Sequence, residues 1–144
     1  MFAHRIFFIS ALVMWSGLVF AEPPQNAEAL VCRTGPGVST EWKDEIPTTN
    51  PSKNEITFTF SELNQSTGSA RLSGPGGSVS VKMVVTTAGV TFIEYLGSGG
   101  VVFTTVYART DTAARTYLAA DTRHNFILGS PIISQFYGVC TGQF

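Results

Sequence analysis

The residues best able to do chemistry in this sequence gather near its C-terminal end. A carboxylate, a guanidinium, an imidazole, a primary amide and a phenol stand among apolar neighbours: Asp121, Arg123, His124, Gln135 and Tyr137. Strong hydrogen-bonding groups beside aromatic rings are typical of a site that recognises a ligand or a partner. A structural role is the competing interpretation, with Asp121 and Arg123 as a pair, Gln135 and His124 bonded to backbone, and Tyr137 in the core.

Catalysis by these groups is a weaker hypothesis. Ser134, His124 and Asp121 have the side chains of a hydrolase triad, but no Gly-x-Ser-x-Gly nucleophile elbow is present. His124 with Asp121, Glu94 or Tyr137 would act as acid, base or orienting group only if these side chains met in one cleft. We therefore assign no catalytic residue and favour a role other than catalysis.

Metal, cofactor and nucleic-acid binding are not predicted. The two cysteines are expected to form a disulfide, and His124 has no carboxylate pair at ligand spacing. The glycine-rich runs at residues 74–77 and 97–100 lack a following Lys-Ser or Lys-Thr pair, so they are hairpin loops rather than phosphate-binding loops. With 9 basic against 10 acidic residues, the chain has no excess of positive charge for nucleic acid.

Glu94 stands in an otherwise apolar run, residues 90–96. One interpretation is an inward carboxylate that marks a ligand cavity. The other places it on the outer face or pairs it with an arginine. Because the alternate face of the run, which includes Ile93 and Tyr95, is equally apolar, we favour the second interpretation.

The N-terminal end is typical of a secretory signal peptide. Arg5 precedes an apolar run at residues 6–20, and cleavage is predicted after Ala21. A retained membrane anchor is the alternative, although the run is shorter than the roughly 20 residues of a spanning helix. Residues 22–144 would then be a single domain in the periplasm or outside the cell, without a membrane span. In such an oxidising compartment we expect Cys32 and Cys140 to form a disulfide.

The rest of the chain has the pattern of short strands. Residues 56–61 and 79–85 alternate with the period of two that a half-buried strand requires. Other β-rich runs lie at residues 29–33, 69–72, 90–96, 101–109, 115–120 and 132–141. About eight short antiparallel strands joined by tight turns predict an all-β meander that closes into a small barrel, with a β-sandwich as the alternative. A Cys32–Cys140 bond would make the first and last strands neighbours, as closure requires.

Residues 34–54 are predicted to be a long loop, because they contain Pro36, Pro47 and Pro51 among many polar residues. Loops of this length usually bind or cover something. Trp42, within this loop, therefore joins the candidate binding residues at the C-terminal end. The full candidate set is Trp42, Arg123, His124, Gln135 and Tyr137.

One stretch of the sequence carries a family resemblance. Arg123-His124 is followed by Gly129 and then by Ser134-Gln135-Phe136-Tyr137-Gly138-Val139-Cys140, and Cys32 stands soon after the predicted signal peptide. In these features the chain resembles a group of small uncharacterised exported proteins of proteobacteria. The resemblance implies a periplasmic location and no particular activity.

The sequence thus predicts an exported, non-catalytic binding or accessory module of the cell envelope, which binds a protein partner or a small ligand. One alternative is a subunit of a larger periplasmic or membrane-associated assembly, since only 13% of the residues are charged and Val, Thr and Phe are abundant. Another alternative is a small periplasmic enzyme that uses His124.

Overall fold

The computed structural model describes residues 22–108 and 115–144. The predicted signal peptide and the last residue of the strand predicted at residues 101–109 lie outside the described residues. The elements are η1 (Pro24–Asn26), β1 (Ala29–Lys43), β2 (Ile46–Ser52), β3 (Ile56–Asn64), β4 (Ser69–Gly74), β5 (Gly77–Thr86), β6 (Gly89–Tyr95), β7 (Val101–Tyr107), β8 (Thr116–Ile127) and β9 (Ser130–Gln143). None of the helices in the described ranges is long and apolar enough to span a membrane.

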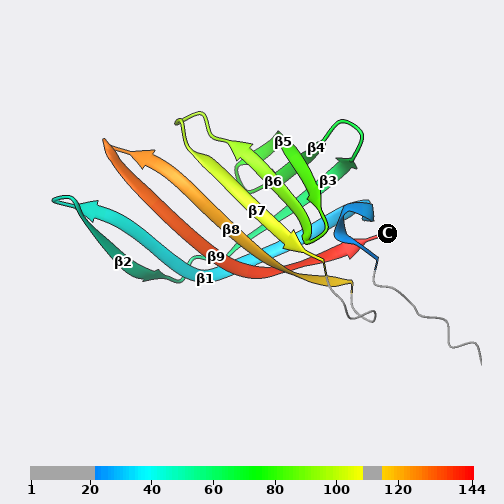
Figure 1. The fold of residues 1–144 in the computed structure, drawn as a ribbon, viewed down its shortest axis with the longest axis horizontal. Helices are drawn as coiled ribbons and strands as arrows, with labels where there is room; N and C mark the ends of the chain where they lie inside the picture. Colours follow the sequence, from blue (N-terminus) through cyan, green and yellow to red (C-terminus); the bar gives the residue numbers. More distant parts are fainter. Residues whose placement is uncertain (1–21, 109–114) are drawn as a thin grey trace, which may run out of the picture.

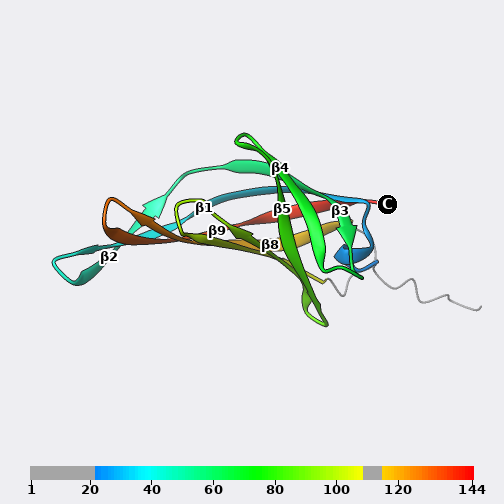
Figure 2. The same cartoon turned by 90° about the horizontal axis from the view of Figure 1, so that it is seen from above.

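Eight of these strands close into an antiparallel barrel. The strands from β3 to β9 pair in chain order, and β1 joins β3 on one side and β9 on the other. β2 lies outside the ring, where it pairs with the far half of β1 (Figure 1). Figure 2 shows the long strands β1, β8 and β9 running along the molecule, with β4 and β5 crossing their direction. The predicted all-β meander and closed barrel are confirmed.

The disulfide lies in the seam that closes this barrel. Cys32 and Cys140 stand directly opposite each other on β1 and β9 and are bonded, 108 residues apart in the chain. Both are fully buried. The predicted pairing is confirmed, and such a bond fits a protein outside the reducing cytoplasm.

The prediction of a long loop at residues 34–54 is wrong. β1 continues to Lys43 because β9 is long enough to pair with it as far as Glu41. The chain then turns back as β2, which contains Pro47 and Pro51. Proline lacks a backbone N–H, and an edge strand has a side on which no N–H is needed. Trp42 accordingly lies near the end of a β-hairpin, opposite Pro47.

The segment from Asp121 to Ile127 also belongs to a strand. β8 and β9 form one long hairpin, and its turn at Leu128 and Gly129 has positive φ angles of 52° and 82°. Two central residues with positive φ form the tight turn that matches the twist of paired strands. The hairpins β1–β2 and β8–β9 end at the same end of the molecule, on the left in Figure 1.

The barrel interior around the disulfide is filled with apolar side chains. Leu30, Phe60, Phe92 and Tyr117 are almost completely buried there beside the disulfide. The rings of Phe60 and Phe92 stack with their centroids 3.7 Å apart. Burying these large side chains supplies much of the free energy that holds the barrel together, at about 25 cal/mol per Å² of apolar surface.

Candidate functional site

A pocket of about 290 Å³ lies on the inner face of the barrel, next to the buried aromatic side chains Phe60 and Phe92. Its walls come from β3 to β8 and from the β4–β5 turn. The lining residues are Ile56, Phe58, Phe60, Leu72, Gly74, Pro75, Gly76, Gly77, Val79, Val81, Phe92, Glu94, Leu96, Val102, Thr104, Asp121, Arg123 and Asn125. The side chains from β3, β4 and β5 are apolar, whereas those from β6, β7 and β8 include every charged group of the lining.

The strand register explains how the polar wall forms. Side chains two residues apart point to the same face of a strand, and side chains opposite each other on paired strands lie side by side. Glu94 is opposite Val102, which is opposite Arg123. Arg123 is in turn opposite Ser134, and Ser134 is opposite Ser39. One row across five strands therefore brings a carboxylate, a guanidinium and two hydroxyls onto the inner face.

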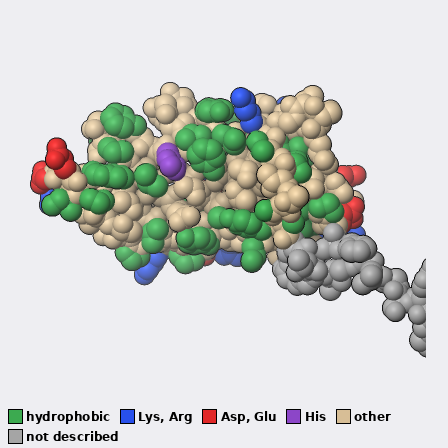
Figure 3. All heavy atoms as spheres, in the orientation of Figure 1, with side chains coloured by type: hydrophobic (Ala, Val, Ile, Leu, Met, Phe, Trp, Pro, Cys, Tyr) green, Lys and Arg blue, Asp and Glu red, His purple; other side chains and the backbone are tan. Residues whose placement is uncertain are grey.

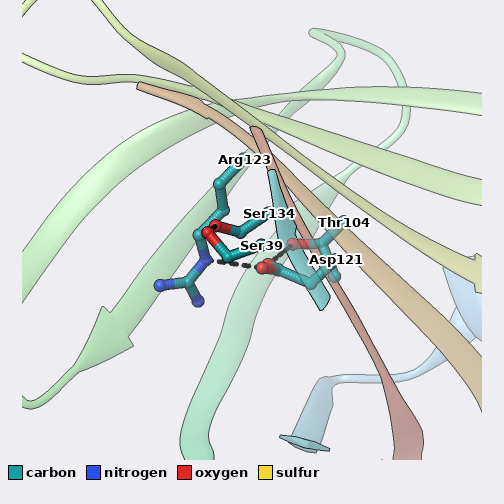
Figure 4. A network of polar contacts seen from close by, with 5 residues as sticks. All are labelled: Ser39, Thr104, Asp121, Arg123 and Ser134. Atoms are coloured by element: carbon teal, nitrogen blue, oxygen red, sulfur yellow. Dashed lines mark hydrogen bonds and ion pairs between the residues drawn. The ribbon is translucent and has the colours of Figure 1, made fainter. Parts of the chain in front are cut away.

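Asp121 anchors the network at the bottom of this wall (Figure 4). Its side chain is 2% exposed and accepts two hydrogen bonds, from Thr104 Oγ1 at 3.0 Å and from Arg123 Nε at 2.6 Å. Beside it, the hydroxyls of Ser39 and Ser134 are hydrogen-bonded to each other at 3.0 Å. A buried carboxylate with a charged donor and a hydroxyl donor has its hydrogen-bonding needs met, so Asp121 holds Arg123 in place.

Arg123 is held on a second side by an aromatic ring. Its guanidinium carbon lies 5.2 Å from the centroid of Phe136, a cation–π distance. Only Nε is bonded to Asp121, and the two Nη atoms point away from that carboxylate (Figure 4). In residues 22–108 and 115–144 no side chain accepts a hydrogen bond from these Nη atoms. The side chain is 25% exposed and lines the pocket, so its Nη donors are available to a bound molecule.

Glu94 faces the barrel interior, so the favoured placement on the outer face is wrong. It lines the pocket on the same face of β6 as the buried Phe92. Within the described part of the chain, no group donates a hydrogen bond to its carboxylate. Partial burial raises the pKa of Glu94 above its ordinary value; the charge of Arg123 opposes this rise, and the charge of Asp121 adds to it. Glu94 is thus an unpaired acid that accepts a proton more readily than an exposed glutamate.

His124, Gln135 and Tyr137 lie on the opposite, outer face of the sheet. His124 follows Arg123 directly and therefore points the other way, where its ring meets Phe103 edge-on at a centroid distance of 5.9 Å. Tyr137 donates a hydrogen bond from its hydroxyl to Gln135 Oε1 at 2.9 Å on the outside of β9. His124 is separated by the sheet from the carboxylates of Asp121 and Glu94, so the fold does not bring it together with either of these acids.

Of the five candidate binding residues, only Arg123 lines the pocket. Two parts of the pocket were not predicted from the sequence: Thr104, which supports Asp121, and the apolar wall around Phe58 and Phe60. Tyr117 and Ala119 are buried and have the same parity as Asp121 and Arg123 along β8, but the sequence does not single out this face, because Leu118 and Ala120 make the other face equally apolar. That parity also separates Arg123 from His124.

A second feature lies outside the barrel, at the end where the two long hairpins turn. Several large apolar side chains are exposed there: Trp42, Ile46, Phe126, Ile127 and Leu128. Leu128 stands fully exposed in the β8–β9 turn. Figure 3 shows hydrophobic side chains spread over this end of the molecule, with acidic groups at its extreme tip. We call these five residues the hairpin-tip patch.

Two further findings bear on the chemistry of the site. Among residues 22–108 and 115–144, no three His, Cys, Asp or Glu side chains gather in a group that could hold a metal ion. The disulfide leaves no free cysteine in these ranges. Comparison with known proteins finds no family model, no curated protein and no solved structure that matches this chain.

Proposed function

We propose that this protein is a non-catalytic binding module that holds a small amphipathic ligand in the open end of its barrel. The observation that carries this proposal is the division of one pocket into an apolar wall and a charged wall. Sites for small molecules are mostly apolar with a few placed polar groups that orient the ligand. The apolar body of the ligand would lie against β3, β4 and β5, and its polar head would face Glu94 and Arg123.

The size of the pocket limits the ligand. A volume of about 290 Å³ is at the lower end of the range of ligand sites, roughly 300 to 1,000 Å³. It corresponds to roughly ten non-hydrogen atoms, if each takes about the share of one water molecule in the liquid. A ligand with one short chain or one ring system fits, and a longer chain would extend through the open mouth.

The composition of the pocket supports binding rather than catalysis. No serine, cysteine, histidine or lysine is among the residues that line it. Asp121 is already bonded to Thr104 and Arg123. The one hydroxyl of the lining that has a base within reach is that of Thr104, and the carboxylate it is bonded to also carries the charge-assisted bond from Arg123, which makes it a weak base.

The proposed location is the bacterial periplasm or the cell exterior. Three features support it: the signal-like residues 1–21, the disulfide in the barrel seam, and the resemblance to exported proteobacterial proteins. A carrier or accessory protein of the cell envelope would work in that compartment.

Blocking the pocket mouth should abolish ligand binding. Val79 lines the pocket near its mouth, and Val84 lies on the outer face of the same strand; they are 45% and 46% exposed. We expect Val79→Trp to weaken the binding of a neutral naphthylamine dye at least tenfold, because the indole would occupy space the dye needs. The matched control Val84→Trp should bind like the unmodified protein, as measured by dye fluorescence.

Circular dichroism establishes that both variants keep the β-barrel before binding is compared. Equal dye binding in all three proteins would place the dye elsewhere and remove the support for a ligand pocket. Failure of the unmodified protein to bind any of a panel of apolar and amphipathic dyes would contradict the proposed function itself.

A second candidate function is docking on a protein partner through the hairpin-tip patch, as in the assembly alternative. Exposed apolar groups gathered at one end are typical of interaction surfaces. Leu128→Asn combined with Phe126→Ser should reduce recovery of a partner from native envelope extract at least tenfold, with Val84→Ser as the control. Asparagine tolerates the positive φ of Leu128, so the fold should persist. Equal recovery of every co-purifying protein by the two variants would rule out this patch as the docking surface.

A further inference from the structure

The unused hydrogen-bonding groups in the pocket identify the kind of head group that the ligand carries. We propose that the ligand is a small carboxylic acid whose carboxylate is bound by the two Nη atoms of Arg123. This inference rests on the proposed function, because it assigns the ligand of the same pocket. Three observations support it: the fixed position of Arg123, the charges that face it, and the unpaired state of Glu94.

The guanidinium of Arg123 is held in a fixed position with two free N–H donor groups. Asp121 binds Nε, and the ring of Phe136 lies 5.2 Å from the guanidinium carbon, so two contacts fix the plane of the group. The free Nη atoms lie on the edge away from Asp121 (Figure 4). A planar pair of N–H donors matches the two oxygens of a carboxylate, and the ordering of the arginine has already taken place in the folded protein.

The charges in the pocket determine when an anion can enter. Facing Glu94 are two charged groups, Asp121 and Arg123, both from β8, and the residues that line the pocket from β3, β4, β5 and β7 are uncharged. Asp121 balances Arg123, so an ionised Glu94 leaves the pocket with one net negative charge. A carboxylate would then be repelled unless Glu94 takes up a proton from solvent.

Glu94 is suited to that proton uptake. Burial already raises its pKa, and a second carboxylate nearby would raise it further. The protonated acid offers an O–H donor to the bound carboxylate, in addition to the donors of Arg123. One proton is thus bound from solvent with each carboxylate, and the affinity should increase as the pH falls.

Other head groups use the pocket less completely. An amine would pair with ionised Glu94, but it would leave the Nη donors of Arg123 without acceptors and would meet the arginine's positive charge. Its affinity would fall at low pH, because it needs Glu94 ionised. An alcohol would bind without a strong dependence on pH. The sign of the pH dependence therefore distinguishes the three classes.

The test compares octanoate, octylamine and octanol, which each have about ten non-hydrogen atoms, by titration calorimetry on the full mature domain. Octanoate should bind best, and its affinity should rise from about pH 8 to about pH 5, by up to tenfold per pH unit. Glu94→Gln should bind octanoate more tightly at neutral pH and lose the part of the pH dependence that Glu94 causes. Octanoate itself titrates in the same way with both proteins. The difference in pH dependence between the unmodified protein and Glu94→Gln therefore reports Glu94 alone.

Arg123→Lys is the second variant of this test. Lysine keeps the positive charge beside Asp121 but lacks the planar pair of N–H donors. Octanoate affinity should fall at least tenfold, while octanol affinity should change less than twofold. Tighter binding of octylamine, or equal pH dependence in the unmodified protein and Glu94→Gln, would overturn the carboxylate assignment. If the dye enters the pocket but octanoate does not bind, only the ligand class fails; if neither binds, the proposed function fails with it.

Discussion

Replacement of both cysteines by alanine should lower the free energy of unfolding by about 4 to 5 kcal/mol. The bond spans 108 residues of chain, so it removes a large part of the conformational freedom of the unfolded state. Domains of this size are stable by about 5 to 15 kcal/mol. The double variant Cys32→Ala with Cys140→Ala is therefore expected to lose about a quarter or more of its stability.

Urea unfolding followed by circular dichroism measures this loss. The unmodified protein unfolded in the presence of a reductant should agree with the double variant, which separates the effect of the bond from that of the two side chains. Intact mass before and after reduction shows whether the bond is formed. A loss below about 1 kcal/mol would mean that β1 and β9 hold the seam closed without the covalent link.

Removal of the buried carboxylate should have the next largest effect. We expect Asp121→Ala to destabilise the barrel by about 3 kcal/mol, since it leaves Arg123 without its partner inside the protein. Arg123 is 25% exposed and can turn partly toward water, which keeps the effect near the lower end of the range for broken buried pairs. Thr104→Val, which removes one neutral donor to the same carboxylate, should cost only about 1 kcal/mol.

The double variant Asp121→Leu with Arg123→Met supplies the control for this interpretation. Apolar residues of similar size often replace a buried ion pair at little cost, so the double variant should regain much of the stability that Asp121→Ala loses. The urea concentrations at which the unmodified protein, Asp121→Ala, Thr104→Val and the double variant are half unfolded test this expectation. Equal destabilisation by the double variant and by Asp121→Ala would show that packing, and not the unpaired charge, explains the loss.

The strand pattern of the barrel was predictable where apolar and polar residues alternate. Residues 56–61 and 79–85 lie within β3 and β5. Alternation identifies such strands because a half-buried strand must present one face to the core. Residues 34–54 could not be predicted in the same way. Their prolines are compatible with a loop and with an edge strand alike, and only the length of β9 extends β1 past the barrel.

Which side chains reach the pocket was less predictable than the strands. Asp121, Arg123 and His124 are close in sequence, and they were predicted to act as one group. In the structure the alternation of β8 sends Asp121 and Arg123 inward and His124 outward. Alternation separates Arg123 from His124, but neither β8 nor the run around Glu94 carries a signal for the inward face, because both faces of each run are apolar.

By itself the sequence determined that the chain is built of antiparallel strands and that Cys32 and Cys140 can tie the first strand to the last. Alternation of apolar and polar residues is a property of a single strand, so the sequence shows it directly. Two cysteines allow only one pairing within the chain, so their count predicts the bond. The tertiary structure alone decided the pocket. The row of inward side chains from Glu94 through Arg123 to Ser39 forms only when distant strands pair in one register and close into a ring.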